Sequence, residues 1–274
     1  MKKIILAVIC IGILFNVSAQ KKEKLKGNKV ITDVFNTLKG FNAVEIGDNL
    51  TVSISQTGST GYHLFADENL ISDVNIQVVD SVLKISTTSN ITSSKKLEIN
   101  LTVAGLEKIT LREDAKLEGQ GRLNLPSLTM VAYDDAKFKL ELNANNSYFR
   151  MTKGVKGELI LSGDKSVMMF DDKSSVKGEV HLKELEIKMN DKSDLELLGD
   201  VTDLKFVGAS NTSLKGKDLR TTTTDLNLSD GSNAHVDTNK MLTINARDNS
   251  SVYVYGQPEI KIEGFNDKAQ IIKR

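Results

Sequence analysis

The sequence predicts an all-β protein, a parallel β-solenoid of about 19-residue rungs with a β-rich cap at its N-terminal end. Three observations predict this fold: a short pattern recurs nine times, its pitch is nearly constant, and its apolar residues alternate with variable ones. Each copy centres on a small or short residue. These residues are Ala115, Ala136, Val155, Ser174, Ser193, Ser210, Ser232, Ser250 and Ala269.

Two apolar columns precede each central residue. Four positions upstream, all nine residues are apolar: Leu111, Ala132, Met151, Phe170, Met189, Phe206, Leu228, Ala246 and Phe265. Six positions upstream, only Glu263 breaks the column. Successive side chains of a strand point to opposite faces, so this spacing of two predicts a short strand with one buried face.

Aspartate dominates the position two residues before each central residue. It fills six of the nine places, as Asp134, Asp172, Asp191, Asp230, Asp248 and Asp267. Aspartate accepts tight turns and can hydrogen-bond its own backbone two residues on. We therefore expect a structural turn here, completed by the serines among the central residues, Ser174, Ser193, Ser210, Ser232 and Ser250.

No copy holds enough apolar residues to close a core alone, so each must stack on its neighbours. Nine rungs spaced by about 4.8 Å would extend roughly 40 Å. A helical interpretation fails because the apolar spacing is two rather than three or four. Residues 109–274 are therefore predicted as regular rungs of a parallel β-solenoid.

Residues 41–108 alternate as well, but without the regular pitch. They predict longer strands and hairpins that cap the solenoid, because terminal repeats are usually atypical and an open end would expose unpaired backbone. No linker interrupts the pattern from there onwards. Residues 41–274 are therefore predicted to form a single domain.

Residues 1–19 have the features of a secretory signal peptide. A basic start precedes the hydrophobic run Ile4–Phe15, and small residues precede a cut ahead of Gln20. The run is too short to span a membrane. Cys10 lacks the small preceding residue of a lipid-modified cysteine, so a lipoprotein is the less favoured alternative.

The Lys-rich segment 20–40 is weakly patterned, and we expect a solvated leader rather than a contact with anionic lipid. Cleavage removes Lys2 and Lys3 from 36 basic residues, which leaves 34 against 36 acidic residues and a net charge of −2. Such a chain lacks the basic stripe that nucleic acids require. Cleavage also removes the single cysteine, which excludes disulfides and thiolate chemistry.

The spacing of polar residues offers no catalytic, metal or cofactor site. His63, His181 and His235 are widely separated, and none has a metal-ligand spacing. Asp172 and Asp191 could share a cation such as calcium across one rung, but neighbouring lysines can neutralise them and the glycine-rich calcium-binding nonapeptide is absent. We therefore predict no catalytic residue, no metal ligand and no cofactor.

A β-helix polysaccharide lyase or hydrolase is the enzymatic alternative. Such sites gather acids and a strong base in one cleft. The six arginines of the mature chain form no dense patch in the sequence, and a chain with no tryptophan and five tyrosines offers little surface for sugar stacking. We therefore expect that the protein is not an enzyme.

Four segments carry a resemblance to a known family: residues 41–56, the turns at 208–210 and 230–232, and residues 255–260. In this order they resemble the head GIN domain family over about residues 41–274. The resemblance implies a secreted or envelope β-solenoid described as an auto-transporter adhesin. It implies no catalytic residues.

The predicted function is a non-catalytic binding module of the cell envelope that presents repetitive polar faces to a glycan or protein partner. The alternative is a structural or stress-related envelope scaffold. Either protein would be exported to the periplasm, the outer-membrane surface or the medium, and the mature chain would hold no transmembrane segment.

Overall fold

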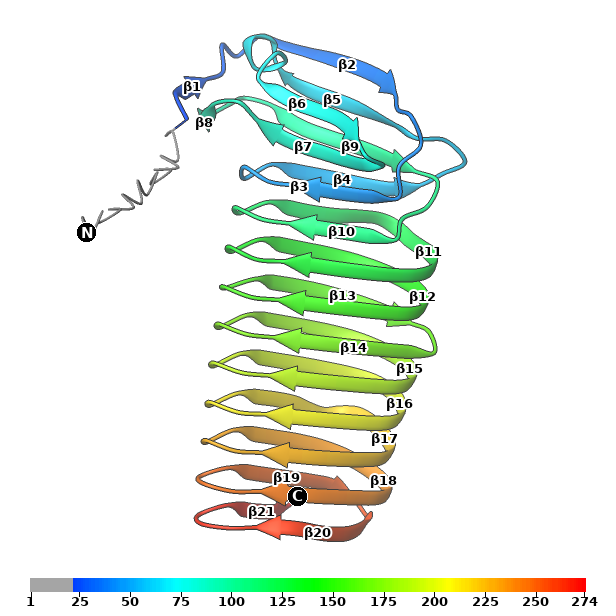
Figure 1. Ribbon diagram of the computed structural model, residues 1–274, viewed down its shortest axis with the longest axis vertical. Helices are drawn as coiled ribbons and strands as arrows, with labels where there is room; N and C mark the ends of the chain where they lie inside the picture. The colour runs from blue at the N-terminus through cyan, green and yellow to red at the C-terminus, as the bar shows by residue number, and fades with distance from the viewer. Residues whose placement is uncertain (1–21) are drawn as a thin grey trace, which may run out of the picture.

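The computed structural model describes residues 22–274, and the expected signal peptide and its cut ahead of Gln20 lie outside these residues. The described chain is almost entirely β, with one short 3₁₀ turn, η1 (Glu68–Leu70). Strands β1 (Lys24–Lys26) and β8 (Asn90–Ser93) form a small separate pair, and the other nineteen strands are linked by hydrogen bonds. Figure 1 shows them as a stack of flattened rungs beneath an N-terminal cap.

The stack is a parallel β-solenoid, as predicted. Its strands are β10 (Lys108–Leu111), β11 (Lys116–Ala132), β12 (Lys137–Met151), β13 (Lys156–Ser162), β14 (Lys165–Phe170), β15 (Ser175–Met189), β16 (Asp194–Gly208), β17 (Ser213–Leu228), β18 (Asn233–Ala246), β19 (Ser251–Gly256), β20 (Glu259–Phe265) and β21 (Gln270–Lys273). Each pairs in parallel with the equivalent strand of the next rung, usually 19 residues on, as Phe149 pairs with Met168.

Each rung folds over at a corner where the alternation of buried and exposed residues breaks. In β12 the break falls at Asn145 and Asn146, which are both exposed. The strand segments that follow a turn form sheet A, and those that precede the next turn form sheet B. Sheet A contains 116–125, 137–144, 156–162, 175–182, 194–201, 213–221, 233–238, 251–256 and 270–273. Sheet B contains 108–111, 128–132, 147–151, 165–170, 184–189, 203–208, 223–228, 241–246 and 259–265.

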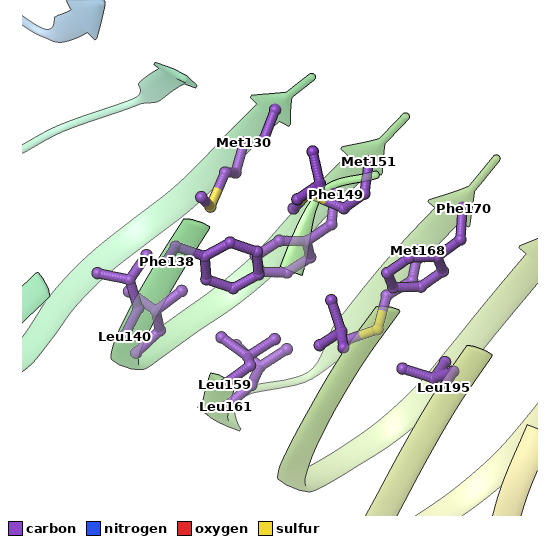
Figure 2. Close-up of a cluster of buried hydrophobic side chains, with 14 of the residues drawn as sticks. Met130, Phe138, Leu140, Phe149, Met151, Leu159, Leu161, Met168, Phe170 and Leu195 are labelled. Atoms are coloured by element: carbon purple, nitrogen blue, oxygen red, sulfur yellow. The ribbon is translucent and has the colours of Figure 1, made fainter. Parts of the chain in front are cut away.

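The core lies between the two sheets. Phe138 and Leu140 from sheet A lie close to Phe149 and Met151 from sheet B, as Figure 2 shows, and all four side chains are at most 5% exposed. The same columns continue through the neighbouring rungs. The repeated apolar spacing thus becomes a continuous buried ladder along the solenoid axis.

Most turns between the sheets have two consecutive residues in the left-handed region, whereas in the turns at Asp248 and Asp267 only the aspartate lies there. Asp172 and Lys173 have φ of 52° and 64°, and the amide of Ser174 donates to the carbonyl of Asp171 at 3.2 Å. This conformation is that of a type I′ turn, which aspartate tolerates. All six aspartates of the predicted turn column lie in the left-handed region, with φ between 50° and 61°.

One rung is displaced by two residues from its expected alignment. Ser210 lies at the tip of its turn with φ of 59°, and the fully buried central residue is instead Thr212. The sequence offers both as short residues, but only the second lies in register with Ser193. Phe206 consequently pairs with Ile187, and its ring fills the space over Gly208, where a Cβ atom would approach it to 2.8 Å.

Glu263 breaks its apolar column because it lies at a β-bulge. Ile262 pairs with Ile244 and Gly264 with Asn245, so Glu263 is the additional residue between them. It is exposed and makes an ion pair with Lys261 at 2.7 Å. The inward column resumes at Phe265.

The N-terminal cap begins as two more rungs and then reverses strand direction. Strands β3 (Ala43–Ile46) and β4 (Thr51–Gln56) pair in parallel with β10 and β11, and β7 (Val82–Thr87) and β9 (Leu97–Val103) pair in parallel with β3 and β4. Above them, β6 (Val74–Val79), β5 (Gly61–Asp67) and β2 (Ile31–Thr37) are antiparallel to their neighbours. The reversal closes this end of the core.

The expected solvated leader is in fact part of this cap, because it contains β1 and β2. The fully buried Asp67 accepts hydrogen bonds from the backbone amides of Lys29, Lys95 and Lys96 at 3.0–3.2 Å. Gly27 lies so close to this carboxylate that a Cβ atom would be 1.9 Å from its Oδ2. One buried acid therefore fastens the segment before residue 41 to the cap.

The C-terminal end of the described chain has no comparable cover. Ile260, Ile262 and Phe265 continue the fully buried inward columns of β18, yet they are 40%, 55% and 41% exposed. The two ends of the solenoid therefore differ.

Candidate ligand groove

The outer surface of sheet A is hollowed into a groove of about 700 Å³. It crosses β11, β12, β13, β15, β16, β17, β18 and β19, so it runs along the solenoid axis. Figure 1 shows these strands stacked in this order. Because the strands pair in register, each position of the groove wall is a column of equivalent residues.

Two β-bulges bend the strands around the centre of the groove. In β11 the register slips between Glu118 and Arg122, where Gly121 has φ of 100°, a conformation that favours glycine. In β17 the register slips opposite Glu196 and Leu198. A bulge bends its strand and increases the local twist, whereas the strands between these two bulges pair without a slip.

A ladder of alternating charge forms one wall of the groove. Its members are Glu118, Lys139, Glu158, Lys177, Glu196 and Lys215, one from each successive rung. Glu158 makes ion pairs with Lys139 at 3.2 Å and with Lys177 at 3.0 Å. Hydrogen bonds from Lys177 and Lys139 lower the pKa of the Glu158 carboxyl.

The neighbouring outward column is partly apolar. It runs Glu141, Ile160, Glu179, Leu198 along successive rungs. Ile160 and Leu198 are 42% and 47% exposed, although the surrounding surface is charged. The groove therefore alternates acidic and aliphatic side chains beside the ladder of alternating charge.

Aromatic rings complete the C-terminal end of the groove. The His235 ring stacks on Tyr253, with centroids 4.2 Å apart and an interplanar angle of 10°, and its Nδ1 lies 3.3 Å from the Tyr255 hydroxyl. Burial lowers the pKa of His235, and the nearby positive charge of Arg274 lowers it further. A neutral imidazole is therefore favoured at neutral pH.

The predicted turn residues lie elsewhere, along the narrow edge of the solenoid. A shallow hollow of about 520 Å³ there includes Asp172, Asp191 and Ser210. Between successive turns the amide of Lys173 donates to the carbonyl of Asp191 at 2.9 Å, so the column forms a backbone ladder. Among residues 22–274 no group of three or more acidic, histidine or cysteine side chains is arranged to hold a metal ion.

The predicted serines, apart from Ser210, lie beneath these turns. Ser174, Ser193, Ser232 and Ser250 are at most 1% exposed. The hydroxyls of Ser174 and Ser193 donate to the carbonyls of Asp171 and Asn190 at 2.8 and 2.7 Å. These two hydroxyls satisfy their turns from inside, whereas the Ser232 hydroxyl accepts a hydrogen bond from the Thr212 hydroxyl at 3.1 Å. None of the four serines lines the groove.

The histidines remain far apart in the fold. His63 lies 2.7 Å from Asp33 in the cap, and His181 lies 3.0 Å from Glu179 on sheet A. Only His235 lines the groove. The structure therefore does not bring the three together.

The charge ladder is the groove feature that sequence reasoning missed. Its signal was present, because the ladder residues lie three positions after the central residue of each rung once Thr212 replaces Ser210. Ile160 and Leu198 carried the same signal, because they lie five positions after Val155 and Ser193 and thus at outward positions, whereas the bulges had none. They depend on how β11 and β17 slip against their neighbours.

These features define a parallel β-solenoid with an antiparallel cap and a groove along one sheet. The chain belongs to the family described as "Putative auto-transporter adhesin, head GIN domain", whose model matches residues 40–171 and 161–258. A comparison with curated proteins found no significant match. The described residues 22–274 contain no helix that is long and apolar enough to cross a membrane.

Solved structures share the fold at low identity. A crystal structure titled a putative adhesin, from Parabacteroides merdae, has 15% identity and a TM-score of 0.70, with 92% of this chain and 99% of that chain covered. A second, titled a putative lipid binding protein, from Parabacteroides distasonis, has 14% identity and a TM-score of 0.65, with 92% and 100% covered. A third, a putative adhesin from P. distasonis, has 13% identity, a TM-score of 0.63 and the same coverage.

Proposed function

We propose that this protein is an exported, non-catalytic binding module of the cell envelope that holds a linear glycan along the groove of sheet A. The groove itself carries the proposal, since it crosses eight successive strands. Seven steps of about 4.8 Å give it a length of about 34 Å. A site of this shape suits an extended partner rather than a compact one.

The chemistry of the groove suits a sugar polymer. A sugar ring presents a C–H face and a rim of hydroxyl groups, and Ile160 and Leu198 offer exposed aliphatic contacts for such a face. Glu141 and Glu179 alternate with them and can accept hydrogen bonds from the rim. The mixture of a few aliphatic contacts and regularly placed polar groups is typical of ligand sites.

The state of Glu158 argues against this residue as a proton donor for hydrolysis. Glycoside hydrolysis needs a carboxylic acid with a raised pKa as proton donor. The pKa of Glu158 is shifted the opposite way by its two lysine partners, so this central acid of the groove stays ionised. Family membership also supports an adhesin-like role.

A structural role in the envelope is the second candidate function, and the exposed apolar side chains of β20 favour it. Ile260, Ile262 and Phe265 there are exposed although they continue buried columns. Exposed strand edges pair readily with other chains. Sedimentation of the mature chain over a range of concentrations tests this role. A structural protein should self-associate as its concentration rises and should show no saturable binding of a glycan.

The glycan-binding proposal is tested with a glycan array followed by titration of the mature chain with the polymers that bind. The double variant Ile160→Asp/Leu198→Asp should lose binding, because two charges replace the aliphatic contacts, while its thermal melt stays close to wild type. Met241→Asp is the matched control, since Met241 is 37% exposed on sheet B. Unchanged binding by the double variant, or release of new reducing ends by the wild type, would contradict the proposal.

A further inference from the structure

A column of three lysines lies beside the charge ladder on sheet A. Lys116, Lys137 and Lys156 pair with one another on three successive rungs, and Thr51 and Ser175 continue the column on either side. All three point outward from the sheet. The three residues Lys116, Lys137 and Lys156 form the lysine strip.

The lysine strip violates the charge pattern of the adjacent column. Like charges directly opposite each other on neighbouring strands are destabilising. The ladder containing Lys139 and Lys177 avoids this by placing an acid between successive lysines, whereas the strip places lysine against lysine twice. Local rules are typically broken at functional sites.

The strip is also not neutralised by nearby acids. Within residues 22–274 none of its three ammonium groups forms an ion pair, whereas Lys139 and Lys177 both pair with Glu158. Asp114 and Asp135, two residues before Lys116 and Lys137, lie in the turns, and Glu158, two residues after Lys156, is paired with Lys139 and Lys177. The positive charge of the strip is therefore available to an external anion.

The lysine strip borders the groove and is continuous with it. It lines a hollow of about 560 Å³ that shares Lys139, Glu158 and Lys177 with the groove. Six lysines and four carboxylates line this hollow, an excess of two positive charges. The groove proper has four lysines and five carboxylates, so the excess positive charge is confined to the side of the strip.

We infer that the lysine strip binds the anionic groups of an acidic polysaccharide lying in the groove. The inference rests on the proposed function and names the class of glycan. Ammonium groups at intervals of about 4.8 Å match a partner that presents anions repeatedly along a linear chain. Three lysines in a chain of near-neutral net charge form too short a stripe for a nucleic acid, which favours the polysaccharide.

The test compares polygalacturonate with its fully methyl-esterified form, which has the same backbone without the charges. The wild-type mature chain should bind the acidic polymer more tightly. The variant Lys116→Thr/Lys137→Thr/Lys156→Thr should bind the acidic polymer about tenfold more weakly. The slope of log Kd against the logarithm of the salt concentration should be smaller by about two. The same variant should melt no lower than wild type, because threonine suits strands and the like charges are removed.

The matched control is Lys188→Thr/Lys205→Thr/Lys261→Thr, which removes three charges from sheet B and should keep wild-type affinity. If the wild type and the strip variant bind the acidic polymer equally well and only Ile160→Asp/Leu198→Asp loses binding, the inference is overturned and the proposed function stands. Binding of neither polymer overturns the inference too. Tighter binding of oligothymidylate or of phosphatidylglycerol vesicles, lost in the strip variant, also overturns it and assigns the strip to that partner.

Discussion

The carboxylate of Asp67 accepts a hydrogen bond from the backbone amide of Lys29 at 3.0 Å and so fastens the N-terminal segment to the cap. The carboxylate is fully buried and also accepts the amides of Lys95 and Lys96. Burial alone would raise the pKa of Asp67, but the donated hydrogen bonds outweigh it and hold the pKa below the ordinary value of 3.8. The ionised form therefore stabilises the fold.

The first prediction is that Asp67→Asn lowers the melting temperature at neutral pH, because an amide NH₂ group would face backbone donors. A folded-state pKa below the unfolded one contributes stability that is complete above the unfolded pKa and is lost as pH falls through the folded one. The melting curves should therefore differ at pH 7, and the difference should narrow only as the pH falls below about 4. A difference that does not narrow at all between about pH 4 and pH 2 would contradict this assignment.

The second prediction concerns the core. Phe170 is 2% exposed, so Phe170→Ala should lower the free energy of unfolding by about 3–5 kcal/mol, the usual cost of such a cavity. Lys173→Ala, on the exposed turn of the same rung, is the control and should cost far less. Coincident urea unfolding curves for the two variants would show that the column is not buried as described.

The third prediction uses the left-handed turn positions. Lys173 has φ of 64°, whereas Gly154 and Gly231 fill the same turn position in other rungs. Lys173→Gly should raise the free energy of unfolding by about 0.5–1 kcal/mol, since relief of left-handed strain exceeds the added freedom of the unfolded chain. Lys173→Val should lower it. Equilibrium unfolding measures both changes, and the reverse order would refute the turn assignment.

The fourth prediction separates a structural turn column from a catalytic or calcium site. Asparagine also adopts left-handed backbone, so Asp172→Asn/Asp191→Asn should change stability by no more than about 0.5 kcal/mol. Glycan binding should be unaffected. The assay is release of reducing or unsaturated ends from acidic and neutral polysaccharides, with and without calcium. Calcium-dependent release that disappears in the double variant would defeat the non-enzymatic proposal.

The fifth prediction concerns export. The basic start, hydrophobic run and small residues before Gln20 predict cleavage by signal peptidase. Mass spectrometry of the exported protein should find Gln20, free or cyclised, as its first residue. A lipid-modified N-terminus at Cys10 would instead place the protein on a membrane anchor.

The solenoid was predictable because in-register stacking buries the side chain at the same position of every rung, so the apolar residues recur at a constant spacing. Phe149, Met168 and Ile187 occupy one inward column, and their 19-residue spacing is visible in the sequence. The rung at Ser210 was displaced because a short residue suits both the turn tip and the buried position beneath it. Thr212, and not Ser210, is identified as the central residue of this rung only by its alignment with Ser193 on the neighbouring rung.

The cap and the groove were less predictable because they depend on contacts without a sequence period. Asp67 joins Lys29 to Lys95 and Lys96, residues that no local pattern connects. The bulges of β11 and β17 have no counterpart in the strands between them, so the bending of the groove could not be predicted from the repeat.

The bulges of β11 and β17 also mark the part of the solenoid in which whole rungs could be added or removed. Between them, β12, β13, β15 and β16 pair without a slip, so deletion or duplication of one 19-residue rung there would shorten or lengthen the groove by one strand spacing, about 4.8 Å. The cross-section would stay the same. Gain or loss of whole rungs would therefore change the length of polymer that the groove can hold in fixed steps of one strand spacing.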